Sequence, residues 1–149
     1  MMKNRIPDSV LEIKLRLGGG GMRKIFKQTF NVEQGEELLK VSRCYLSTTA
    51  GPIAGLLFVS THKIAFCSEK SLTIPSTNGG LIRTPYKVVV PIEKIKRVEE
   101  SQNVDKRKQK YIEIVTIDHF DFWFMGFVNY EKAFKCLQRS INISQQQSL

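Results

Sequence analysis

The sequence is poor in the residue types from which most metal and catalytic centres are built. Its 149 residues include two histidines, three cysteines and one tryptophan. The cysteines form no CxxC pair and stand among apolar neighbours, which predicts small buried side chains in a reducing compartment (Cys44, Cys67 and Cys136). A zinc site needs four ligands, or three and an open position, so the two distant histidines argue against a bound metal (His62 and His119).

Long apolar runs and catalytic signatures are also missing. No run reaches the roughly 20 apolar residues of a transmembrane helix, and residues 1–20 show no apolar stretch typical of a secretory signal. GxSxG, HExxH, P-loop and GxGxxG patterns are absent, and Gly18–Gly21 lacks the preceding strand of a phosphate loop and predicts a flexible joint. Asp118 and Asp121 bracket a predicted turn, where capping is commoner than catalysis. We therefore expect no enzyme activity and no cofactor.

Acidic residues are few in comparison with basic ones. The chain has 23 Lys and Arg against 14 Asp and Glu, a net charge of +9. This balance favours a polyanionic partner, which is a nucleic acid, an anionic membrane surface or an acidic protein. The excess is concentrated in residues 1–27 and in Lys106–Lys110. That second run has no interleaved aromatic residues, so nucleic-acid binding is disfavoured.

The first 37 residues predict short helices. Ser9 and Glu12 match a capping box, and Gly18–Gly21 would end the helix that starts there. The same segment also alternates as a strand would, at Leu11, Ile13, Leu15 and Leu17, and this alternative stays open. Further on, four apolar residues at helical spacing predict a second short helix that docks on the body of the protein (Met22, Ile25, Phe26 and Phe30).

From residue 38 the pattern becomes that of strands and ends in a helix. Turn signals separate seven apolar, β-branched and aromatic runs: Leu38–Leu46, Ile53–Ser60, Lys63–Ser68, Lys87–Ile92, Ile95–Ser101, Tyr111–Ile117 and Phe120–Phe124. Glu69–Tyr86 between them is predicted to be a long polar loop. Asn129 is a good N-cap for a helix whose apolar stripe ends at Ile141, and the polar tail from Ser144 is expected to fray. Seven short strands with mostly short connections predict an antiparallel sandwich or small barrel.

The aromatic run Phe120–Phe124 is predicted to divide between two faces. Strand alternation puts its three phenylalanines together in the core and Trp123 on the other face. For Trp123 we favour packing beneath the C-terminal helix over an exposed position.

Several segments resemble a known family. Gly55–Ser60 followed by Ile64–Ser68 looks like the central hairpin of a GRAM domain, and Val90–Ile92 with Ile95–Val98 resembles its next segment. Cys44–Gly55 and Phe120–Phe127 are similar to plant GEM-like, abscisic-acid-responsive GRAM proteins. The resemblance covers roughly residues 22–141.

The resemblance implies a pleckstrin-homology-like fold, mainly β, with a seven-stranded antiparallel barrel or sandwich capped by a C-terminal α-helix. The implied domains are a basic extension at 1–21, the GRAM domain at 22–141 and a polar tail at 142–149. It further implies a non-enzymatic module of plant hormone or developmental signalling, which binds phosphoinositides and other anionic lipids at cytoplasmic membranes, with the nucleus left open. The alternative is a protein-interaction scaffold without lipid binding.

Pleckstrin-type lipid sites are built around the loop between the first two strands, yet Ser47–Pro52 contains no cation here. Headgroup-specific binding is therefore less expected than electrostatic, salt-sensitive association. No exposed apolar wedge is visible in the sequence. The candidate anion-binding residues are Arg43, Lys63, Lys70, Arg83, Lys87, Lys106, Arg107, Lys108 and Lys110.

Overall fold

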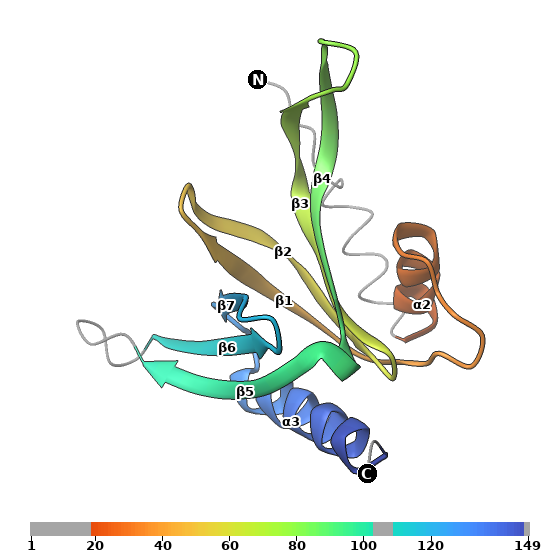
Figure 1. The fold of residues 1–149 in the computed structure, drawn as a ribbon, viewed down its shortest axis with the longest axis vertical. Helices are drawn as coiled ribbons and strands as arrows, with labels where there is room; N and C mark the ends of the chain where they lie inside the picture. Colours follow the sequence, from red (N-terminus) through yellow and green to blue (C-terminus); the bar gives the residue numbers. More distant parts are fainter. Residues whose placement is uncertain (1–18, 103–108, 148–149) are drawn as a thin grey trace.

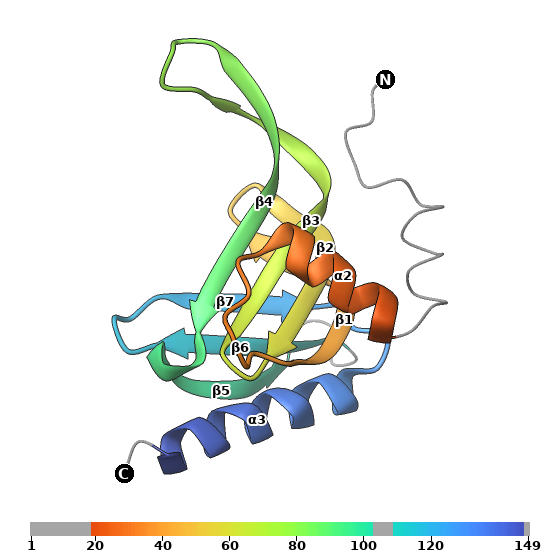
Figure 2. The same ribbon diagram turned by 90° about the vertical axis from the view of Figure 1, so that its right-hand side faces the viewer.

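A single antiparallel sheet of seven strands forms the body of the protein. The computed structural model describes residues 19–102 and 109–147. The strand order is β4-β3-β2-β1-β7-β6-β5, and helices α2 and α3 lie on opposite sides of the sheet (Figures 1 and 2). The elements are α2 Gly19–Thr29, β1 Leu38–Thr48, β2 Gly51–Ser60, β3 Lys63–Pro75, β4 Leu81–Pro91, the 3₁₀ turn η1 Ile92–Lys94, β5 Ile95–Gln102, β6 Lys110–Thr116, β7 Asp121–Met125 and α3 Tyr130–Gln147. The predicted strands and C-terminal helix are confirmed.

The sheet bends strongly but is not closed into a barrel. β4 and β5 are its two edge strands, and η1 between them redirects the chain from one end of the sheet to the other. The fold is thus the open form of the predicted barrel or sandwich, with α3 covering its concave side (Figure 2).

The larger core lies between the sheet and α3. Phe66, Ile112, Ile114 and Phe124 are each at most 2 % exposed and pack with Leu137, which is fully buried. Ala133 and Ile141 complete the predicted apolar stripe of α3. Burying a large apolar side chain contributes about 1.5–3 kcal/mol, so this face supplies much of the stability.

A second core lies on the other face of the sheet, beneath α2. Met22, Ile25, Phe26 and Phe30 are all buried there, which confirms the predicted docking helix. Phe26 stacks on Phe58 of β2 with ring centroids 5.4 Å apart. Because β2 is covered on both faces, its apolar run is continuous where a half-exposed strand would alternate.

The predicted loop at residues 69–86 is wrong. β3 continues to Pro75 and β4 begins at Leu81, so these residues form the outer half of a long hairpin. The register slips between Cys67 and Ser71, which is a bulge at the point where the ladder leaves the core. Neither helix covers the outer half, and its turn residues dominate the sequence signal over the short alternation from Ser71 to Ile74.

Both helices are longer than predicted. Gly19–Gly21 form the first turn of α2 instead of a joint, and α3 continues to Gln147 past the predicted fraying at Ser144. Docking of the apolar face outweighs the low helix propensity of glycine. The predicted first helix lies outside the described residues, and the domain boundaries stay predictions.

Two expectations for the β7 region are also wrong. Phe120 is 63 % exposed because it belongs to the β6–β7 turn, whereas Phe124 is buried as predicted. Trp123 lies half-buried on the face away from α3, with its ring edge-on to Tyr111 and its Nε1–H donating to Asp121. Asp118 caps the turn: a hydrogen bond from the Thr116 hydroxyl lowers the pKa of its carboxyl.

The cysteines are buried or half-buried, as their apolar neighbours predict. Cys44 and Cys67 are buried and Cys136 is half-buried, and none of the three forms a disulfide. Burial raises the pKa of all three thiols, which keeps them protonated and unreactive.

Candidate functional site

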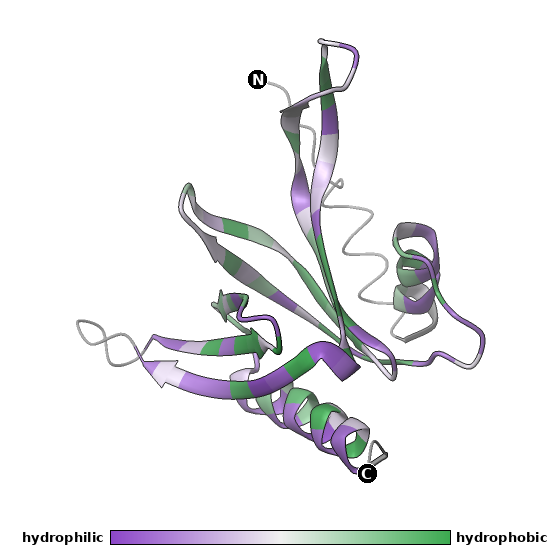
Figure 3. Cartoon of the chain, viewed as in Figure 1, coloured by the Kyte–Doolittle hydropathy of each residue, from purple (hydrophilic) through white to green (hydrophobic). Residues whose placement is uncertain are grey.

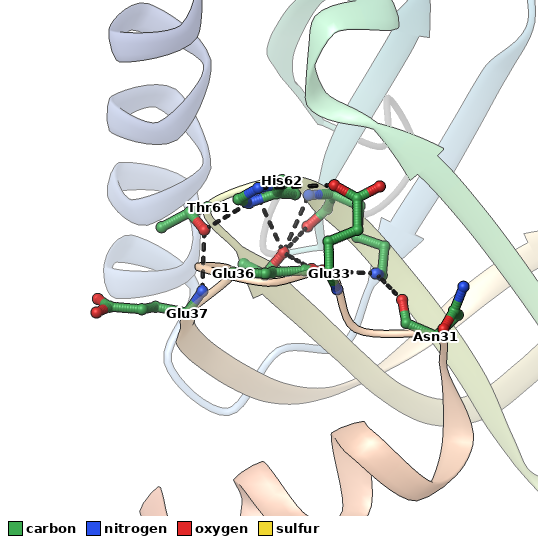
Figure 4. Close-up of polar contacts among 8 residues, drawn as sticks. Asn31, Glu33, Glu36, Glu37, Thr61 and His62 are labelled. Atoms are coloured by element: carbon green, nitrogen blue, oxygen red, sulfur yellow. Dashed lines mark hydrogen bonds and ion pairs between the residues drawn. The ribbon is translucent and has the colours of Figure 1, made fainter.

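Lys63 is a structural residue and is not available to a ligand. Its Nζ lies 2.9 Å from Glu36 Oε1 and donates to the Asn31 carbonyl at 2.6 Å (Figure 4). The two side chains of this ion pair are only 10 % and 0 % exposed. Burial raises the pKa of Glu36, but hydrogen bonds from Ser60, from the backbone N–H of Glu33 and from Lys63 outweigh it and leave the pKa below its ordinary value. Lys63 therefore drops out of the predicted anion-binding set.

The same network fastens the segment before β1 to the β2–β3 turn. The Thr61 hydroxyl accepts from the Glu37 backbone N–H at 3.0 Å, and His62 Nδ1 lies 2.8 Å from that hydroxyl (Figure 4). His62 Nε2 is 3.7 Å from Glu33. Across residues 19–102 and 109–147, no three His, Cys, Asp or Glu side chains gather closely enough to hold a metal ion. Over the same residues, no helix is long and apolar enough to cross a membrane.

Arg43 and Lys110 are already partnered by acidic residues. Arg43 Nε lies 2.9 Å from Glu69 Oε1, at the base of the outer hairpin. Lys110 Nζ lies 3.8 Å from Glu131 Oε1 and 5.4 Å from the centre of the Tyr130 ring. Lys106, Arg107 and Lys108 lie outside the described residues.

An open apolar groove of about 600 Å³ lies beside Lys110. At Gly126, where φ is +72°, a Cβ would stand 2.7 Å from the Tyr45 ring, so glycine leaves the space that this ring needs. Burial, then the nearby Glu100 and Glu131, raise the pKa of Tyr130, so its hydroxyl stays neutral. Sequence reasoning missed the groove because its walls come from distant segments: Tyr45, Pro52, Gln109, Lys110, Met125, Gly126, Phe127 and Tyr130.

The remaining described cations of the predicted set lie on the β3–β4 hairpin. Lys70, Arg83 and Lys87 are exposed on the β3–β4 hairpin. Lys87 Nζ donates to the Thr29 carbonyl at 3.2 Å and lies 5.9 Å from the centre of the Phe30 ring. It thereby joins the hairpin to the C-terminal end of α2, which lies across the outer face of the sheet (Figure 2).

Helix α2 adds three cations that site prediction missed. Arg23, Lys24 and Lys27 are exposed and point away from the buried face of the helix. Their signal was present in the sequence, as basic residues between the apolar positions of an amphipathic helix. We call these six side chains the basic surface: Arg23, Lys24, Lys27, Lys70, Arg83 and Lys87. Residues 19–30 and 70–91, which carry it, contain no Asp or Glu.

Strand β4, which carries Arg83 and Lys87 of the basic surface, also exposes apolar residues. Leu81 is 73 % exposed, Val89 50 %, Ile82 46 % and Tyr86 38 %, all on β4. Apolar colour accordingly returns toward the tip of this hairpin (Figure 3). The sequence shows no exposed apolar wedge, whereas the structure exposes these four side chains, because segment 69–86 is predicted to be a loop and not a strand.

The strand order, the open bent sheet and the C-terminal helix together define a pleckstrin-homology-like fold. Residues 24–144 match the GRAM domain, and the chain belongs to this family. A solved structure, the C-terminal domain of an unknown protein from Leishmania infantum, superposes with a TM-score of 0.58 at 21 % identity, covering 82 % of this chain and 95 % of that one. The fold prediction is confirmed.

Among GRAM proteins, the chain is similar to the GEM-like proteins of Arabidopsis thaliana. It is 57 % identical to GEM-like protein 4 over 136 residues, covering 88 % of this chain and 61 % of that protein. It is also 57 % identical to GEM-like protein 6, covering 89 % and 63 %. The chain thus spans about three-fifths of the length of these relatives, and the predicted family resemblance is confirmed.

Proposed function

We propose that this GRAM domain binds anionic phospholipid membranes peripherally through the basic surface. The observation that carries the proposal is six exposed cations on α2 and the β3–β4 hairpin, where the one neighbouring carboxylate in sequence, Glu69, is paired with Arg43. Near an anionic bilayer each Lys or Arg contributes about 1 kcal/mol, and the attraction fades beyond a Debye length of about 8 Å. The charges are spread over a helix and a hairpin, which suits a surface with many phosphates better than one headgroup. As part of this proposal, the setting is abscisic-acid-related or developmental signalling in plants, at the cytoplasmic side of a membrane.

Co-sedimentation with vesicles of phosphatidylcholine and phosphatidylserine tests the proposal. In one variant, Lys24→Gln, Lys70→Gln and Arg83→Gln remove three charges from the basic surface. In the matched control, Lys132→Gln, Lys135→Gln and Arg139→Gln remove three exposed charges from α3, on the opposite side of the sheet. We expect the first variant to bind at least about tenfold more weakly and the control to bind almost like the parent. Equal losses would reject the basic surface as the contact.

A protein-interaction scaffold is the second candidate, and the apolar groove supports it. Its wall of Tyr45, Phe127 and Tyr130 has the aromatic character of protein-binding surfaces. A Tyr45→Ala variant separates the two functions. Vesicle binding that persists in this variant, together with loss of a partner captured by the parent, would favour the scaffold as an added role.

A further inference from the structure

We propose that the tip of the β3–β4 hairpin inserts into the acyl region of an anionic bilayer, with Leu81 and Ile82 as the inserting side chains. This inference rests on the proposed function, and it assigns to that function a contact other than charge. It also assigns a role in membrane contact to the outer half of the hairpin, whose described side chains have no part in packing either core.

The outer hairpin projects away from both cores. In β3, residues 63–68 are all buried, whereas in β4 no residue from Leu81 to Lys87 is buried. Figures 1 and 2 show the two strands continuing as a narrow arm well past the rest of the sheet. An arm of this shape can enter a bilayer before any other part of the described chain touches it.

The tip is ordered by its own hydrogen bonds. Ser76 donates its backbone N–H to the Gly80 carbonyl at 2.9 Å and accepts from the Gly79 N–H at 3.2 Å, and its hydroxyl accepts from the Asn78 N–H at 3.1 Å. Gly79 has a φ of +85°, which the turn requires. Backbone groups paired in this way reduce the cost of bringing the turn toward the lipid.

Leu81 and Ile82 make the tip apolar on both sides. They are 73 % and 46 % exposed, and successive strand residues point to opposite faces. Leu81 also pairs across the ladder with Pro75, another exposed residue without charge. An exposed apolar edge is a liability in water, which natural strands usually blunt, so its presence here indicates a contact surface.

Arg83 and Lys87 lie at distances from the hairpin tip that suit contact with lipid phosphates. Arg83 follows Leu81 by two residues, which is about 7 Å along the strand and matches the 5–10 Å depth of interfacial insertion. Its long side chain can bury its stem and reach the phosphates. Lys87 lies six residues behind the tip, about 20 Å, so the hairpin must approach obliquely for α2 to reach the same surface.

The β6–β7 turn also exposes apolar residues but lacks this charge complementarity. Ile117 and Phe120, in the β6–β7 turn, are 58 % and 63 % exposed. Asp118 lies between them and Asp121 follows Phe120, and an anionic leaflet would repel these carboxylates. The two turns therefore make a pair with similar apolar exposure, of which only the β6–β7 turn carries carboxylates.

Tryptophan placed at each turn measures insertion directly. In a Trp123→Phe background, which removes the native indole, Leu81→Trp is the test and Ile117→Trp the control. The probe is a vesicle of phosphatidylcholine and phosphatidylserine whose acyl chains carry bromine, a contact quencher of indole fluorescence. We expect emission from residue 81 to shift to shorter wavelength and to fall at least about twofold, and emission from residue 117 to stay unchanged.

Serine substitutions at the hairpin tip measure how much insertion contributes to vesicle binding. Leu81→Ser with Ile82→Ser should weaken vesicle binding about tenfold or more, and Ile117→Ser should not change it. Thermal melting of each variant checks that folding is retained.

The outcomes separate this inference from the proposed function. Parent protein that sediments with the vesicles while residue 81 stays unquenched would reject insertion and leave peripheral binding in place. Parent protein that does not sediment would overturn both. A parent that self-associates, and loses that association on Leu81→Ser, would instead identify the tip as a contact between copies of the chain.

Discussion

The inner and outer halves of the β3–β4 hairpin share one ladder but belong to different environments. In the inner half, residues Lys63 to Ser68 of β3 are all buried and contribute Phe66 to one core and Ala65 to the other. The outer half is uncovered and carries exposed Leu81, Ile82 and Arg83. The same local structure therefore stabilises the fold at one end and presents a surface at the other.

Two lysines of β3 show this contrast within a single residue type. Lys63 is buried in an ion pair with Glu36, whereas Lys70 is exposed within the bulge. An ammonium ion that is buried must be paired, because its desolvation is costly. A substitution of Lys63 should therefore lower the stability of the fold, whereas a substitution of Lys70 should weaken membrane binding.

The largest expected effect is on stability, from the inner half. Phe66→Ala should lower the free energy of unfolding by about 3–5 kcal/mol, because it leaves a cavity in the α3-side core. Leu81→Ala in the outer half should change it by no more than about 0.5 kcal/mol. Denaturant unfolding measures both free energies. Similar losses of stability at the two positions would contradict the distinction between the inner and outer halves.

Breaking the buried ion pair comes next. Lys63→Ala should cost about 3 kcal/mol, since it leaves the Glu36 carboxylate buried without its partner. The control, Lys70→Ala, should leave the unfolding transition in place. If Lys63→Ala instead weakened vesicle binding without destabilising the protein, Lys63 would belong to the basic surface after all.

The same pair predicts a smaller, pH-dependent effect. The pKa of Glu36 is below its ordinary value of 4.5 in the folded protein. Its contribution to stability is therefore present above pH 4.5 and is lost as the pH falls through the lowered folded pKa. We expect unfolding free energies of the parent to fall over this acidic range, with a weaker slope in Glu36→Gln. Identical slopes would contradict the network around Lys63.

The smallest effect concerns a single charge of the outer half. Lys70→Ala should weaken binding to phosphatidylserine-containing vesicles about fivefold, and added salt should shrink the difference between variant and parent. Lys135→Ala on α3 is the matched control, and we expect it to bind like the parent. A salt-independent loss for Lys70→Ala would point to a contact other than charge.

The sequence predicts the elements that have a covered face and misses those that do not. The strands around Phe58, Phe66 and Phe124 and the helix with Leu137 carry apolar patterns because they face a core. The outer hairpin faces water on both sides, so its residues suggest a loop. Lys63 and Lys70 look equivalent in sequence, and only the position of Glu36, which comes from another segment, separates them. The groove near Tyr45 is likewise formed by segments far apart in the chain.

Amide hydrogen exchange, with and without vesicles containing phosphatidylserine, tests most directly whether the basic surface and the hairpin tip contact the membrane. We expect vesicles to slow exchange in α2 and in the hairpin from Ser71 to Tyr86, and to leave α3 and the β6–β7 turn unchanged. Slower exchange confined to the groove around Tyr45, Phe127 and Tyr130, with the hairpin unaffected, would contradict this account and place the contact at the groove.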